Sequence, residues 1–250
     1  MKHIYGVETK EELIKYQQFV EKIQPKLDKY LEFLKEEYDV IDLPRTIIWT
    51  SEEIATSLIS DLPVPAYTNE YRVVLCPDIK AWHNIYLKQL DNMDKNTETY
   101  KTLEEYYNNI SENYMLQILG HELAHHSELF LDDFDSPLSN GIWFEEGMVE
   151  YISRQYFLTK EEFEAEAHFN QQLVDFFKEK YGSHSLEDFG EATYEGDYAS
   201  IFFEYWRSFL AIKGIIEAHN GDIHKAFEAY HKWNETGSDK TLVEWFKVNI

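Results

Sequence analysis

The sequence has little cysteine, little basic charge and no long apolar run. Cys76 is the only cysteine, so the chain can form no disulfide within itself and no zinc site built from several thiolates. It carries 23 basic against 47 acidic side chains, a formal charge of −24, which opposes binding to phosphate backbones and anionic membranes. No apolar run is long enough to span a bilayer, and residues 1–8 lack the apolar core of a signal peptide. These absences predict a soluble, cytoplasmic protein that binds neither nucleic acid nor membranes.

What is present is typical of a folded globular protein, with 44% apolar and 16% aromatic residues. Apolar residues recur at helical spacing from Lys10 to Tyr38, which predicts a long amphipathic helix. The runs 46–50 and 71–75 are β-branched or apolar and lie close to prolines, so they predict short strands. Cys76 follows the second run, where a buried structural role is expected.

Beyond Ser111 the pattern is almost entirely helical. Thr159 with Glu162 forms a capping box, and Gly182 is a helix stop. We therefore expect a mainly α protein with a small, largely antiparallel sheet. The expected organisation is an N-terminal helical segment, a sheet-bearing part and a helical part within one compact catalytic unit, at residues 1–40, 41–110 and 111–250.

The strongest motif is His-Glu-Leu-Ala-His at residues 121–125. Four residues advance a helix by about one turn, so His121 and His125 project from one face and can bind one ion. Glu122 points off that line, near enough to act on a metal-bound water without being a ligand. Two imidazoles and a carboxylate base at this spacing are typical of zinc hydrolases. Gly120 lies inside this predicted helix and costs about 1 kcal/mol relative to alanine unless close packing compensates.

A second element, residues 143–151, offers a third ligand, which a catalytic zinc site needs besides an open position for water. A loop through residues 132–141, rich in Asp, Ser, Pro, Asn and Gly, can turn the chain back and lay a second helix against the first. Neighbouring helical residues point about 100° apart, so only one of Glu145 and Glu146 can face the two histidines. Glu150, one turn after Glu146, is placed to accept the free N–H of a ligand histidine.

Together the two elements resemble the gluzincin zinc peptidases. His121-Glu122-Leu123-Ala124-His125 with Phe144-Glu145-Glu146-Gly147-Met148 is similar to the alanyl-aminopeptidase and leukotriene-hydrolase branch, where an Asn-Glu-Gly-Phe element follows the HExxH motif. The resemblance covers roughly residues 70–250 and implies a thermolysin/aminopeptidase-like catalytic domain with one Zn²⁺ per chain and Glu146 as the third ligand. In the gluzincin pattern an edge strand borders the cleft, and residues 71–75 are the candidate for that strand. Glu145 stands where the family has Asn, and the gap between the elements is slightly longer, so Glu145 stays open as the alternative.

The resemblance also implies a tyrosine that stabilises the tetrahedral oxyanion. Its positional match is Tyr194, followed by Glu195-Gly196, and Tyr198 is the second candidate. The family's Gly-x-Met-Glu-Asn segment, whose glutamate recognises a free substrate N-terminus, is absent, which argues against exopeptidase activity. The large N-terminal β-domain of the aminopeptidases is missing too, so the resemblance implies a minimal catalytic unit.

Two other functions fit parts of the pattern. Glu122 with His125 and Glu228 with His231 are both Glu-x-x-His pairs, and two such pairs with two further glutamates make a di-iron carboxylate bundle. That interpretation leaves His121 and the second element unexplained. A zinc-binding interaction module without hydrolysis would keep the same ligands.

The sequence thus predicts a zinc-dependent hydrolase, most simply a peptidase acting on a peptide or protein substrate. In this prediction Glu122 takes a proton from the attacking water and passes it to the leaving amine. Zinc and Tyr194 hold the oxyanion. The predicted metal ligands are His121, His125 and Glu146. No pattern in the sequence specifies the oligomeric state or the identity of the substrate.

Overall fold

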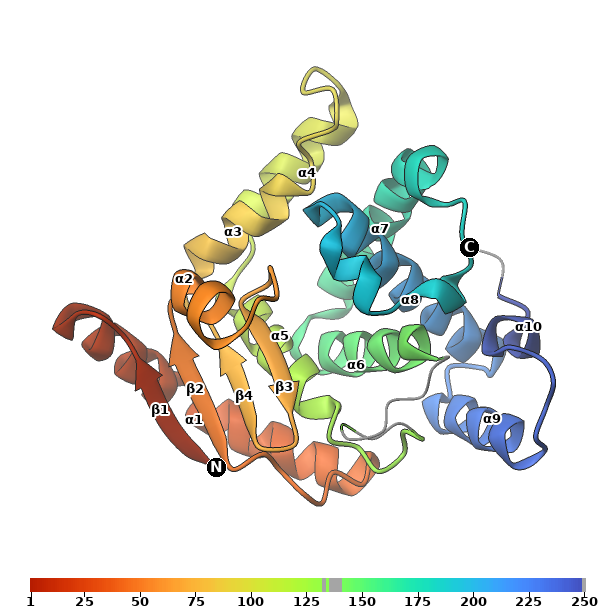
Figure 1. Ribbon diagram of the computed structural model, residues 1–250, viewed down its shortest axis with the longest axis horizontal. Helices are drawn as coiled ribbons and strands as arrows, with labels where there is room; N and C mark the ends of the chain where they lie inside the picture. The colour runs from red at the N-terminus through yellow and green to blue at the C-terminus, as the bar shows by residue number, and fades with distance from the viewer. Residues whose placement is uncertain (132–133, 135–140, 249–250) are drawn as a thin grey trace. The chain divides into compact units, whose positions relative to one another are not determined.

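A computed structural model describes residues 1–131, 134 and 141–248, and it is mainly helical with one small sheet (Figure 1). The strands are β1 (Lys2–Gly6), β2 (Thr46–Thr50), β3 (Ala66–Asn69) and β4 (Arg72–Leu75). The longer helices are α1 (Lys10–Glu37), α3 (Ile79–Lys88), α4 (Glu98–Asn108), α5 (Glu112–Ala124), α6 (Ile142–Phe157), α7 (Lys160–Tyr181), α8 (Tyr198–Ala218) and α9 (Ile223–Glu235). Short helical turns are α2 (Glu52–Ile54), η1 (Ala55–Ile59), η2 (Leu186–Asp188), η3 (Glu191–Glu195) and α10 (Leu242–Phe246). Apart from residues 134 and 141, the loop expected at residues 132–141 lies outside the described residues.

The chain divides into two compact units. The first comprises Met1–Glu128 with Tyr156–Leu158, and the second comprises Leu129–Gln155 with the remainder from Thr159. The sheet and α5 therefore belong to the first unit, whereas α7, α8 and α9 belong to the second. No helix in the described part of either unit has the length and apolar character needed to cross a bilayer.

The four strands lie in the order β1-β2-β4-β3. β1, β2 and β4 run parallel, and only β3 pairs antiparallel, with β4. The prediction of a largely antiparallel sheet was therefore wrong, and the sheet is mixed. The physical reason is that α1 connects β1 to β2 as a crossover helix, which returns the chain to the end of the sheet from which it started.

The predicted edge strand lies inside the sheet. β4, which covers most of the expected strand 71–75, has β2 on one side and β3 on the other. Val73, Val74 and Leu75 are all fully buried, as in a strand that is covered on both faces. β1 and β3 are the edges. Cys76 directly after β4 is buried as expected, and burial raises the pKa of its thiol to about 11.

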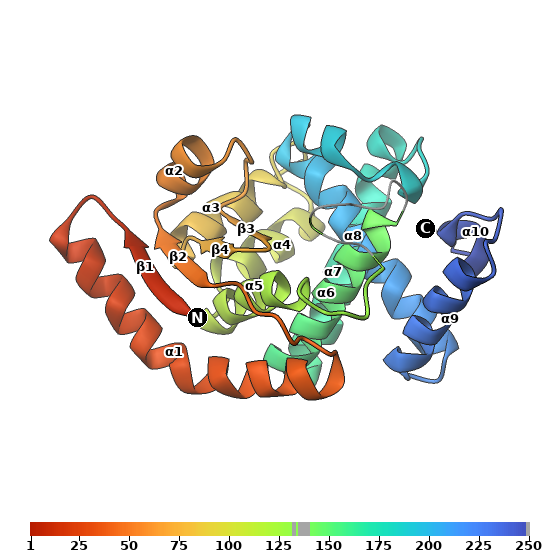
Figure 2. The same cartoon turned by 60° about the horizontal axis from the view of Figure 1, so that its bottom comes forward.

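Helices cover both faces of the sheet. α1 and α5 lie on one face, and α2 lies on the other (Figures 1 and 2). On the α1 face the ring of Phe19 meets that of Trp49 in β2 at 5.9 Å between centroids. On the other face the hydroxyl of Tyr67 in β3 donates to the carbonyl of Ala55, at 3.0 Å. α5 contacts both β3 and β4, so the helix that bears the HExxH motif packs directly on the sheet.

The predicted N-terminal helix is confirmed, within one residue at its C-terminal end. A capping box starts α1, because the side chain of Thr9 accepts from the amide of Glu12 and the side chain of Glu12 accepts from the amide of Thr9. Its buried face consists of Tyr16, Val20, Ile23, Leu27, Tyr30 and Leu34. Pro25 lies inside the helix and lacks the N–H of one helical hydrogen bond, which accounts for the bend of α1 visible in Figure 2.

The second unit is built from packed helices. The predicted capping box of Thr159 and Glu162 starts α7, and Gly182 ends that helix, so both predictions are confirmed. α7 packs along α8. Phe144 near the start of α6 stacks on Tyr230 of α9, with 4.3 Å between ring centroids. This aromatic contact fixes the start of α6, where the candidate carboxylate ligands Glu145 and Glu146 lie.

Candidate metal centre

The HExxH motif lies at the C-terminal end of α5. Ser111 caps the other end of the helix by accepting from the amide of Asn113, at 3.3 Å. Every residue from Tyr114 to Ala124 is buried, as in a helix at the centre of a core. His125 is the residue that ends α5, but its backbone is still helical, with φ −57° and ψ −19°. The one-turn geometry between His121 and His125 is therefore kept.

Gly120 lets two aromatic side chains approach the motif. A Cβ at this position would lie 2.6 Å from Cε2 of Phe157 and 3.0 Å from Cε1 of Tyr30. The Tyr30 hydroxyl also donates to the Gly120 carbonyl, at 3.0 Å. This is the close packing that compensates for glycine in a helix interior, and it holds α5 against α1.

The two histidines of the motif direct the same ring nitrogen at each other. The Nε2 atoms of His121 and His125 are 3.3 Å apart, and the rings are nearly perpendicular at 73°. Two nitrogens bound to tetrahedral zinc at about 2.0–2.1 Å are separated by about 3.3–3.4 Å. The spacing of this pair therefore fits one tetrahedral ion without movement of either ring.

The pair belongs to a group of three residues that could hold a metal ion. His121, His125 and Glu146 each offer one ligand atom, and these atoms all lie within 4.8 Å of one another. Within the described residues the group contains Glu146 and not Glu145. His121 is buried, His125 is partly buried, and one carboxylate oxygen of Glu146 is shielded from solvent. Two imidazoles and one carboxylate are a donor set suited to zinc.

Glu122, the predicted general base, is buried in α5, with only 6% of its surface exposed. It directly follows His121 and is separated from His125 by two residues. Burial of a carboxylate carries a large desolvation penalty unless a cation or hydrogen bonds offset it. A buried glutamate at this point of the motif therefore needs a cation or hydrogen bonds around its carboxylate.

Gly147 explains why the residue after Glu146 has no side chain. A Cβ at Gly147 would lie 2.4 Å from the backbone oxygen of Ser208 and 2.5 Å from Cγ1 of Ile212, both on α8. A backbone atom cannot turn away as the end of a side chain can. Only glycine allows α6 and α8 to cross at this distance.

We expect Gly147→Ala to lower the free energy of unfolding by about 1–3 kcal/mol, the usual cost of overpacking a core. The matched control is Gly214→Ala, because Gly214 is also a helical glycine, is exposed, and a Cβ added there would meet nothing within 4 Å. That change should raise stability by up to about 1 kcal/mol through helix propensity. Urea unfolding of both variants checks this, and equal effects at the two glycines would contradict the close crossing.

Glu150 lies in a largely buried ionic network of the second unit. Its carboxylate is 2.8 Å from Nε of Arg154, and Arg154 also lies 3.7 Å from the carboxylate of Glu166 and over the ring of Phe209. All three charged side chains are 6–13% exposed. Glu150 lies one helical turn after Glu146, and the ion pair with Arg154 fixes the position of its carboxylate. The predicted hydrogen bond from the N–H of a ligand histidine to Glu150 stays a prediction.

The two candidate oxyanion donors occupy different local settings. Tyr194 lies in η3, and its hydroxyl is 2.6 Å from the hydroxyl of Tyr205 on α8. Tyr198 is the first residue of α8 and stacks on Phe202, with 6.4 Å between ring centroids. The mutual hydrogen bond of Tyr194 and Tyr205 uses the hydrogen of only one of the two phenols. The role of Tyr194 in catalysis stays a prediction.

The second Glu-x-x-His pair is placed differently from the first. Glu228 is exposed on α9, and Nε2 of His231 lies 2.9 Å from the carbonyl oxygen of Leu129. The described residues form no further group of three metal-binding side chains around this pair. His231 thus contacts the backbone, and this local setting gives the di-iron interpretation no support.

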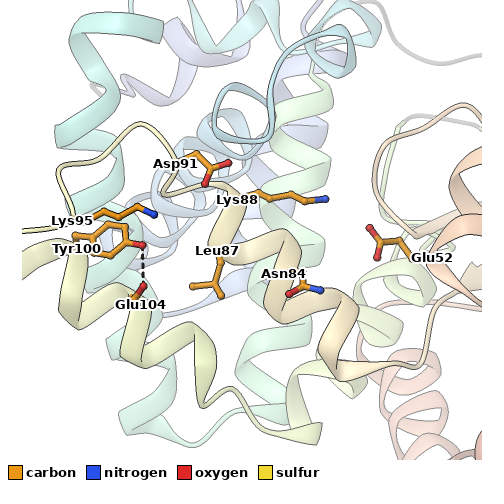
Figure 3. A pocket seen from close by; sticks show the side chains of 8 residues that line it. All are labelled: Glu52, Asn84, Leu87, Lys88, Asp91, Lys95, Tyr100 and Glu104. Carbon is orange, nitrogen blue, oxygen red and sulfur yellow. Dashed lines mark hydrogen bonds between the residues drawn. The ribbon is translucent and has the colours of Figure 1, made fainter.

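A separate hollow of about 390 Å³ lies in the first unit beside α3 and α4 (Figure 3). Its lining residues are Glu52, Asn84, Leu87, Lys88, Asp91, Lys95, Tyr100 and Glu104. Its lining thus includes three carboxylates and two ammonium groups, and the Tyr100 hydroxyl donates to Glu104 at 2.9 Å. The lining includes no histidine or cysteine and none of the predicted catalytic or metal-binding residues.

One contact next to the motif was not predicted. Nε2 of His126 is 2.9 Å from the hydroxyl oxygen of Thr68 in β3. Burial, with a smaller contribution from His125, lowers the pKa of His126 to about 4, so its ring is neutral at neutral pH. The helical spacing places His126 about 100° away from His125, but no feature of the sequence identifies Thr68 as its partner.

Comparison of the chain with protein-family models, curated protein sequences and solved structures gives no match. The resemblance to gluzincin peptidases therefore rests on the two sequence elements alone.

Proposed function

We propose that the protein is a zinc-dependent hydrolase, most simply a peptidase. The observation that carries the proposal is the 3.3 Å separation of the Nε2 atoms of His121 and His125 on a buried helix end. Glu146 completes a group of two imidazoles and one carboxylate, the ligand set of several zinc peptidases. A three-residue set leaves a fourth position of a tetrahedral ion open to water or substrate.

Zn²⁺ in this group would lower the pKa of a coordinated water toward neutrality and polarise the scissile carbonyl. Glu122 then accepts the proton of the attacking water and delivers it to the leaving nitrogen. Because Glu122 is buried, its carboxylate is shielded from bulk water, which would otherwise compete for the proton that it passes to the leaving nitrogen. A phenol such as that of Tyr194 donates a hydrogen bond to the negative charge that develops on the carbonyl oxygen.

The proposed substrate is an extended peptide that pairs with an edge of the sheet. Because β4 is internal, the strand suited to this role is β3, which is an edge strand and contacts α5. Hydrogen bonds between the main chains of β3 and the peptide require an extended backbone and depend little on the side chains of the peptide. The proposal therefore names a peptide or protein as the substrate and leaves the sequence preference to pockets along the strand.

The first experiment is elemental analysis of the purified chain, before and after treatment with a chelator and readdition of metal. We expect one zinc per chain, and hydrolysis of a peptide library that is lost with the chelator and restored by zinc. Two irons per chain would instead support a di-iron bundle. Stoichiometric zinc without cleavage of any peptide or other hydrolysable substrate would make the protein a zinc-binding interaction module.

A further inference from the structure

The contact between His126 and Thr68 joins the end of the motif helix to the edge strand. His126 is only 8% exposed, and it follows His125 directly. The Thr68 hydroxyl lies 3.4 Å from the carbonyl oxygen of Arg72 and 2.9 Å from Nε2 of His126. The carbonyl oxygen of Asn69 lies 3.5 Å away. The hydroxyl can donate its single hydrogen to only one of these partners, and the tautomer of His126 sets which atom donates in the 2.9 Å bond. Both residues lie in the first unit.

The register of the sheet shows which peptide groups of β3 face the open edge. The amide of Cys76 donates to the carbonyl of Pro65, at 2.9 Å, and hydrogen-bonded pairs alternate along an antiparallel ladder. Tyr67, which is paired with Val74, is therefore a hydrogen-bonding partner of β4. Ala66 and Thr68 direct their backbone N–H and C=O groups away from β4. Thr68 thus offers its backbone at the edge while its side chain is held by His126.

We propose that His126 is a positioning residue that fixes the edge strand β3 against the metal-bearing end of α5 and so places the backbone of Thr68 for an extended peptide. The proposal rests on the proposed function for its substrate, but the link between helix and strand is independent of it. An edge strand is hydrogen-bonded to a neighbouring strand on one side only. A side-chain contact at Thr68, the penultimate residue of β3, therefore contributes much of what holds this strand in place. His126 directly follows His125 in the same turn, so the position of one of these residues fixes the position of the other.

Thr68→Val keeps the shape and the strand preference of threonine but removes the hydroxyl. The contact to His126 is then lost, together with the bonds to the carbonyls of Asn69 and Arg72. His126→Phe leaves that hydroxyl in place and removes the imidazole, so it should speed amide exchange in β3 as Thr68→Val does. Thr68→Ser keeps the hydroxyl and is the matched control. Because one such hydrogen bond changes an opening equilibrium by about two- to tenfold, amide exchange in β3 should become faster by this factor in Thr68→Val. Exchange in α5 should stay unchanged, and Thr68→Ser should behave as the wild type. His126→Gln, which keeps a donor at a similar reach, should also preserve slow exchange in β3.

The second measurement is the cleavage of two substrates by the zinc-loaded chain. In Thr68→Val the KM of an extended peptide should rise about two- to tenfold, the factor of one lost hydrogen bond, with kcat nearly unchanged. A short substrate that cannot reach β3 should be cleaved as by the wild type. Equal losses for both substrates, an unchanged KM, or wild-type exchange in β3 would each overturn the proposal. If the wild type cleaves no peptide, the proposed function fails, and the exchange measurement on the metal-free chain still decides whether His126 anchors β3.

Discussion

Glu122→Gln is expected to lower kcat by about 10²- to 10⁴-fold, the usual contribution of a general base, with one zinc per chain retained. Glutamine has the size and hydrogen-bonding capacity of glutamate, but it has no basic oxygen that can accept a proton from water. Glu122 is outside the group formed by His121, His125 and Glu146, so its replacement leaves all proposed ligands in place. The expected result is therefore a stable, zinc-loaded and nearly inactive chain.

The measurement combines kcat on a cleaved peptide with the zinc content of the same sample. Glu128→Gln is the matched control, because Glu128 is an exposed glutamate three residues after His125, and that variant should keep full activity. Loss of metal from Glu122→Gln would mean that Glu122 is itself a ligand, as in a di-iron bundle. Full activity with full zinc content would remove Glu122 from the mechanism.

Local sequence patterns predicted the helices well because helices are made of local contacts. The apolar spacing in residues 10–38 and the capping box of Thr159 with Glu162 both depend on residues three or four apart. The HExxH spacing is local in the same way. It predicts the facing of His121 and His125 correctly, although α5 ends between them.

The sheet was harder to predict because strand order depends on contacts between distant residues. β1 is a five-residue strand with two polar side chains, Lys2 and His3, and it shows no clear alternation. Its pairing with β2 depends on the crossover through α1. For β4 a usable signal exists. Three consecutive apolar residues, Val73 to Leu75, indicate a strand buried on both faces rather than an edge.

Around the candidate metal group, too, local features are evident in the sequence, whereas contacts between distant residues are not. The glycine after Glu146 is evident in the sequence, but its cause is the backbone of Ser208 on α8, 61 residues later in the chain. The contact between His126 and Thr68 spans 58 residues. In both cases the residue itself is conspicuous in the sequence, whereas the partner that explains it becomes apparent only in three dimensions.

The adjacent glutamates Glu145 and Glu146 should differ sharply in their effect on zinc affinity. Loss of groups that merely orient metal ligands typically weakens binding by about 10- to 100-fold, so loss of a ligand itself should exceed this. Only Glu146 belongs to the group whose ligand atoms lie within 4.8 Å of one another. We therefore expect Glu146→Ala to weaken zinc binding by more than about 100-fold, and Glu145→Ala to leave it nearly unchanged.

Competition with a chromophoric chelator measures zinc affinity in both variants, and thermal unfolding of the metal-free chains shows whether either change harms the fold. Because Glu145 and Glu146 are neighbours near the start of α6 and are both only partly buried, each serves as the control for the other. Glu146→Gln adds a finer test. It keeps an oxygen donor but removes the negative charge, and a neutral amide is a weaker zinc ligand than a carboxylate, so its affinity should lie between those of the wild type and Glu146→Ala. The reverse order of Glu145→Ala and Glu146→Ala would assign the third ligand to Glu145.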